Sequence, residues 1–205
     1  MATSESNKLF ILEKVLFFII LGLCIWGFWY FEGSLILRIA TLILGSVSLY
    51  LVFLKVPSKT PLPSKLELGA LLILYLGIFS LYNFLYSLNL PLPSIMVAIL
   101  LLVSGLCFSV LSLDRANDIL GKEIYRTFII LMGIVILEIF LSLYFWPIGP
   151  EAKTLIIVVI FYLIMSLIYL YIHSMLRLKR VLGYLVIGVL IIGTILITVY
   201  LQLPK

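Results

Sequence analysis

Charged residues are scarce in this chain of 205 residues: 11% are Asp, Glu, Lys or Arg, whereas 64% are hydrophobic. A soluble domain carries roughly 25% charged and about 45–50% apolar residues. A soluble fold could not hide so much apolar surface, because its outside must be in contact with water. A lipid bilayer removes that difficulty. The composition therefore excludes an ordinary soluble domain and predicts an integral membrane protein.

Metal-binding and redox residues are equally few. His173 is the only histidine, which excludes a bis-His haem or a histidine-based zinc centre within one chain. The two cysteines, Cys24 and Cys107, lie inside apolar stretches, where we expect small buried side chains rather than a disulfide framework. A serine nucleophile with a partner histidine and a phosphate-binding glycine loop are both absent. We therefore predict no cofactor, no metal and no catalytic residues.

Seven apolar stretches are each long enough to cross a bilayer as a helix, which needs about 20 residues. They cover residues 10–31, 35–54, 66–88, 94–113, 127–146, 154–172 and 181–203. They leave no room for an extramembrane domain, so we predict one all-α transmembrane bundle over residues 1–205. Lys8 and Lys14 precede the first stretch without an Ala-x-Ala-like cleavage site, and we expect that stretch to remain as a helix.

The positions of lysine and arginine predict the orientation of the bundle. Three basic residues fall on one side of the predicted spans: Arg38, Lys153 and Lys205. The other eleven fall on the opposite side: Lys8, Lys14, Lys55, Lys59, Lys65, Arg115, Lys122, Arg126, Arg177, Lys179 and Arg180. Because basic loops stay in the cytoplasm, we predict the N-terminus inside and the C-terminus outside. The net charge of +5 comes from short clusters and not from one long basic run, so we expect no nucleic acid as a partner.

Glu138 is the costliest exception to the apolar pattern. It lies deep in the fifth predicted helix, about 12 Å from its outer end at about 1.5 Å per residue. A charged residue at such a depth costs about 2.5–3.5 kcal/mol on insertion scales and usually marks a function or a partner. Two interpretations remain open: a proton or cation site, or an interhelical hydrogen bond that holds helices together.

Other polar side chains fall in the same outer half of the predicted bundle: Arg38, Asn83, Tyr162 and Thr194. Together with Glu138 they form a candidate intramembrane polar site, in which Arg38 is the candidate counter-charge. Which of these side chains face one another does not follow from the sequence.

Two clusters lie at the predicted cytoplasmic face. Arg177, Lys179 and Arg180 form a basic patch, for which we expect contact with lipid headgroups or a partner. Asp114 and Asp118 share the spacing of metal-binding aspartates in some lipid-processing enzymes. The loop lacks the further downstream acids that such motifs use. The Asp118–Lys122 and Glu123–Arg126 spacings favour helical ion pairs on an interfacial segment.

The segment with Glu138, Trp146-Pro147 and Tyr162 resembles uncharacterised multi-pass membrane proteins of bacteria. The resemblance covers about a quarter of the chain. It implies residence in a bacterial inner membrane and implies no particular activity.

These patterns favour a non-enzymatic membrane subunit or scaffold that packs against itself or another membrane protein within the lipid bilayer. An alternative is a small proton- or cation-coupled carrier with Glu138 at its intramembrane site. A lipid-modifying enzyme that uses Asp114 and Asp118 is the third hypothesis.

Overall fold

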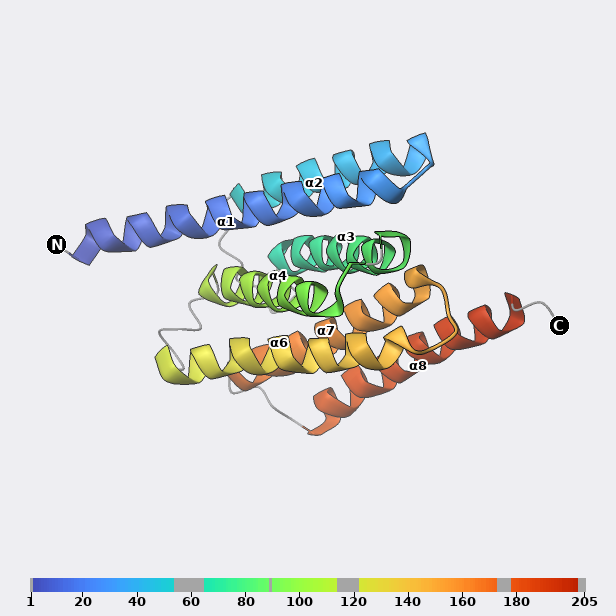
Figure 1. Cartoon of the computed structure of the whole chain (residues 1–205). Helices are drawn as coiled ribbons and strands as arrows, with labels where there is room; N and C mark the ends of the chain where they lie inside the picture. The colour runs from blue at the N-terminus through green and yellow to red at the C-terminus, as the bar shows by residue number, and fades with distance from the viewer. Residues whose placement is uncertain (1, 54–64, 89, 114–121, 173–177, 203–205) are drawn as a thin grey trace. The chain divides into compact units, whose positions relative to one another are not determined.

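The chain is all-α in a computed structural model that describes residues 2–53, 65–88, 90–113, 122–172 and 178–202. Within these ranges there are seven helices (Figure 1). They are α1 (Ala2–Phe31), α2 (Leu35–Phe53), α3 (Lys65–Leu88), α4 (Leu92–Leu113), α6 (Lys122–Tyr144), α7 (Pro150–Ile172) and α8 (Leu178–Gln202). The chain divides into two compact units, Met1–Arg115 and Ala116–Lys205, and each is described separately below.

Four segments of the described helices are long and apolar enough to cross a membrane: Gly69–Leu88, Glu123–Tyr144, Pro150–Tyr171 and Val181–Leu201. Three shorter apolar segments lie in the remaining described helices: Phe18–Phe31, Leu35–Ser46 and Leu92–Phe108. The predicted all-α architecture is therefore confirmed, and the length and composition of its helices fit a membrane protein. The number of spans, the orientation and the single domain stay predictions.

The ends of several helices differ from those of the predicted apolar stretches. α1 and α7 begin earlier, because their first turns are polar and yet helical. The first helix begins at Ala2 instead of residue 10, and α7 begins at Pro150 instead of residue 154. Proline is favoured at the first helical position, because its missing N–H would have no helical partner there. α6 ends at Tyr144, two residues before the end of its predicted stretch. Hydropathy locates a span but does not register these polar first turns.

In the unit Met1–Arg115, α3 packs against α1, α2 and α4 and carries more buried side chains than any other helix of the unit. Glycines permit the close approach of these helices. A Cβ on Gly77 of α3 would lie 2.6 Å from Leu102 Cδ2 of α4 and 3.0 Å from Cys24 Sγ of α1. A Cβ on Gly27 of α1 would lie 3.0 Å from Ser80 Oγ of α3. Small residues at helix interfaces are the usual means of close packing in membranes.

The turn between α1 and α2 is held by a short hydrogen-bond network. Arg38 Nε donates to the main-chain oxygen of Glu32 at 2.6 Å, and the main-chain N–H of Ser34 donates to Glu32 Oε1 at 2.9 Å. Trp29 Nε1 donates to Thr41 Oγ1 at 3.2 Å, and that hydroxyl donates to the oxygen of Arg38 at 2.8 Å. Because the last carbonyls of a helix lack helical partners, the Arg38 side chain caps the end of α1.

In the unit Ala116–Lys205, α6 packs against α7 and α7 packs against α8. The turn between α6 and α7 resembles the α1–α2 turn in its chemistry. Lys153 is 1% exposed, and its Nζ donates to the main-chain oxygen of Tyr144, the last residue of α6, at 3.0 Å. Lys153 and Arg38 both stand at the fourth residue of the second helix of their hairpin. In both hairpins a cation therefore neutralises the negative end of the preceding helix.

Candidate functional site

Glu138 lies on an exposed face of α6, six residues before the helix ends. At about 1.5 Å per residue, its Cα stands about 9 Å from that end. The carboxylate makes no hydrogen bond or ion pair with any residue that the structure describes. The nearby Ser142 hydroxyl donates to the main-chain oxygen of Glu138 at 2.8 Å and not to its carboxylate. α6 is thus long enough to cross a membrane and carries an exposed carboxylate that has no partner among the residues that the structure describes.

The face around Glu138 is otherwise apolar. We name the Glu138 face by its exposed residues, which recur every three or four positions along α6: Leu131, Ile134, Glu138 and Ser142. The opposite side of the helix is buried at Met132, Ile136, Phe140 and Leu143. α6 thus has one buried and one exposed stripe, and the other helices of its own unit leave the exposed stripe uncovered.

The other two candidates in this unit are turned to different neighbours. The ring of Tyr162 on α7 packs edge-to-face with Tyr184 of α8, with ring centroids 6.5 Å apart. Thr194 on α8 is exposed, and its hydroxyl donates to the oxygen of Leu190 at 2.8 Å. Neither side chain bonds to Glu138.

The two candidates in the first unit have main-chain partners. Arg38 caps the end of α1, and Asn83 Nδ2 donates to the oxygen of Phe79 in its own helix at 2.9 Å. Arg38 and Asn83 thus bond to different carbonyls and not to each other. The role of Arg38 as a counter-charge to Glu138 stays a prediction.

The predicted cytoplasmic clusters are described only in part. Arg177, Asp114 and Asp118 lie outside the described residues, whereas Lys179 is exposed in the first turn of α8. Arg180 follows Lys179 in the same helix. In the described part of the chain, no group of three or more His, Cys, Asp or Glu side chains is placed to hold a metal ion.

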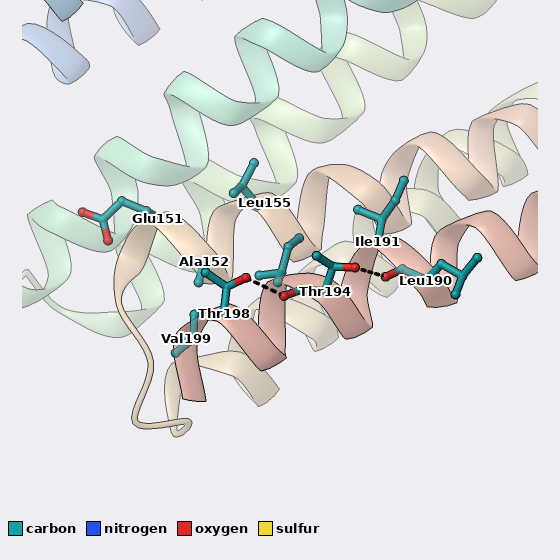
Figure 2. Close-up of a pocket in the computed structure, with 9 residues that line it drawn as sticks. Glu151, Ala152, Leu155, Leu190, Ile191, Thr194, Thr198 and Val199 are labelled. Carbon is teal, nitrogen blue, oxygen red and sulfur yellow. Dashed lines mark hydrogen bonds between the residues drawn. The ribbon is translucent and has the colours of Figure 1, made fainter. Parts of the chain in front are cut away.

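A groove between α7 and α8 is a feature that the sequence did not predict (Figure 2). Its volume is about 460 Å³. Three polar residues and six apolar ones line it: Glu151, Thr194 and Thr198, with Ala152, Leu155, Leu190, Ile191, Ile195 and Val199. Figure 2 shows the two threonine hydroxyls turned along α8, where Thr194 donates to Leu190 and Thr198 donates to the oxygen of Thr194 at 2.8 Å. The walls of the groove therefore present mainly hydrocarbon.

Comparison with known proteins finds no matching family model, no matching curated protein and no matching solved structure. The resemblance to bacterial multi-pass proteins stays a prediction. Any function must therefore be argued from the Glu138 face and the groove themselves.

Proposed function

We propose that this chain is a multi-pass membrane protein of seven spans, with its N-terminus in the cytoplasm and its C-terminus outside. We further propose that it is a non-enzymatic subunit of a bacterial inner-membrane assembly, which binds a second membrane protein through the Glu138 face. The observation that carries this proposal is the exposed, unpaired carboxylate of Glu138 on a helix of membrane length.

The two capped hairpins support the proposed orientation. With seven spans, the α1–α2 turn and the α6–α7 turn both join an odd-numbered span to the next and so lie on the same side. Arg38 and Lys153 are two of the three basic residues on that side, and each donates to a carbonyl at a helix end. Their presence outside is thus explained by capping, and it does not oppose the positive-inside rule.

The cost of an exposed carboxylate in hydrocarbon supports a protein partner over lipid. A charged side chain at depth costs about 2.5–3.5 kcal/mol on insertion scales. An interhelical hydrogen bond in a membrane returns about 0.6–2 kcal/mol, and a cationic donor reduces the charge cost further. The partner helix should therefore carry a lysine, arginine or amide side chain about 9 Å from the outer end of its span, opposite Glu138.

A carrier would place its acid against an internal cavity. Glu138 is not among the residues that line the groove between α7 and α8. The exposed position of Glu138 thus favours lateral association over transport through this unit.

Photo-crosslinking in native membranes tests the association. A photoreactive amino acid replaces Ile134 or Ser142, which flank Glu138 on the same face. We expect a protein adduct of discrete mass at both positions, which Glu138→Leu abolishes and Glu138→Gln retains in part, because an amide still forms a hydrogen bond. Glu123→Gln is the matched control, since Glu123 is also exposed on α6 but lies at its opposite end.

The mass of the adduct identifies the occupant: twice the chain mass indicates a second copy, and another mass indicates a different protein. If the protein is folded and abundant but yields only lipid adducts, the proposal is overturned. An adduct that Glu138→Leu leaves unchanged would also overturn it. Cation-dependent uptake by proteoliposomes that is lost in Glu138→Gln would establish the carrier instead.

A further inference from the structure

The groove between α7 and α8 opens toward one end of both helices. The two helices approach closely at Gly188, where a Cβ would collide with the Leu163 side chain. Gly188 is the only buried residue among those of α8 whose exposure the structure describes. The groove residues of α8 all lie C-terminal to this contact, and those of α7 lie in its first two turns. The helices touch at Gly188 and separate beyond it. Because Ala152 has a small side chain, it does not fill the space, and the groove remains.

The dimensions of the groove favour a single hydrocarbon chain. It runs along α8 from Leu190 to Thr198, eight residues or about 12 Å. That length is most of the hydrocarbon thickness of one leaflet, which is about 15 Å. Because six of the nine residues that line it are apolar, the groove suits a hydrocarbon chain better than a polar ligand.

One end of the groove carries an acidic side chain, Glu151. Glu151 is exposed in the first turn of α7, and its carboxylate makes no hydrogen bond or ion pair with any residue that the structure describes. Trp146 is exposed in the preceding turn, and tryptophan is enriched at the level of lipid headgroups. A carboxylate at that level attracts an ammonium group and repels an anionic headgroup.

We propose that this groove binds one acyl chain of a phospholipid whose headgroup carries an ammonium group, with Glu151 contacting the ammonium. The acyl chain lies along Ala152, Leu155 and Leu190, where it covers apolar walls that α7 and α8 leave open. This proposal rests on the membrane placement proposed above, but it does not depend on the Glu138 contact.

Native mass spectrometry of the full chain, released from nanodiscs of defined composition, tests the proposal. The discs hold phosphatidylethanolamine and phosphatidylglycerol with matched acyl chains in equal amounts. We expect one retained phospholipid per chain, with phosphatidylethanolamine preferred by roughly two- to fivefold, the ratio that an exposed ion pair supplies. Glu151→Gln should keep the occupancy and abolish the preference.

Filling the groove should remove the lipid whatever its headgroup. Ala152→Phe places a ring at a buried residue that lines the groove. Thr198→Phe fills the groove from an exposed position, where we expect little effect on folding. Val189→Phe is the control, because Val189 is 70% exposed on α8 and does not line the groove. Equal retention of both phospholipids by the unmodified chain would overturn the proposal. So would retained lipid in Thr198→Phe, or a loss in Val189→Phe as large as in Thr198→Phe.

The groove and the Glu138 face are independent sites if Thr198→Phe loses the lipid but keeps the Glu138 crosslink. Absence of bound lipid together with a normal Glu138 crosslink would reject the groove alone. Loss of the Glu138 crosslink with normal lipid retention would reject the partner face alone.

Discussion

Gly77→Leu should lower the free energy of unfolding by about 3 kcal/mol, at the upper end of the usual cost of overpacking a core. Gly77 lies where α1, α3 and α4 meet, and even a Cβ would stand 2.6 Å from Leu102 Cδ2 and 3.0 Å from Cys24 Sγ. Leu102 and Cys24 are both buried, so neither side chain has an open space into which it can move. Titration with sodium dodecyl sulfate in mixed micelles measures the change in unfolding free energy.

Gly22→Leu is the matched control for this substitution. Gly22 lies in α1, and a Cβ there would meet nothing within 4 Å. Because leucine has a better helix propensity than glycine and Gly22 is exposed, we expect Gly22→Leu to be neutral or slightly stabilising. Equal destabilisation by both substitutions would show that Gly77 is not a point of close helix contact.

Lys153→Met should lower the free energy of unfolding by about 1.5–3 kcal/mol, the range for a hydrogen bond that involves a charged group. Methionine has nearly the length of lysine and fills its buried space, but it leaves the oxygen of Tyr144 without the Nζ donor. The favourable interaction of a cation with the C-terminal end of α6 is lost at the same time. The same titration measures this change.

Lys179→Met controls for the loss of a positive charge. Lys179 is exposed in the first turn of α8, and a surface substitution of this kind usually changes stability by less than about 0.5 kcal/mol. A Lys153→Met chain as stable as the unmodified protein would contradict the capping role. A more stable chain would indicate that burial of the ammonium costs more than its hydrogen bond to Tyr144 contributes.

The sequence predicts the helices well because hydropathy and length both constrain a segment that lies in lipid. Each of the seven apolar stretches corresponds to a helix in the described residues. Hydropathy does not predict the polar first turns of α1 and α7. In α7 it falls at Glu151 and Lys153, although the helix already includes them. Proline at position 150 was the available signal for the earlier start of α7.

The candidate site was less predictable, because depth along a helix says nothing about direction around it. Arg38 and Glu138 share an outer layer by sequence, yet Arg38 donates to the carbonyl of Glu32. That Glu138 lies on the exposed side of α6 can be inferred only from the burial of Ile136 and Phe140 on the opposite side. The groove depends on the close contact of Gly188 with Leu163, a pairing between two helices that no local pattern contains.

Cysteine labelling in intact cells tests the central claim, a chain of seven spans with both capped hairpins outside. Cys24 and Cys107 are buried, so the unmodified protein is the unlabelled reference for a membrane-impermeant maleimide. Single cysteines replace Gly33 and Pro147 in the two hairpins, and Lys59 and Asn117 in the predicted cytoplasmic loops. We expect labelling of the two hairpin cysteines in intact cells, and labelling of the two loop cysteines only after permeabilisation. Labelling of one hairpin cysteine without the other, or of the loop cysteines in intact cells, would contradict the account.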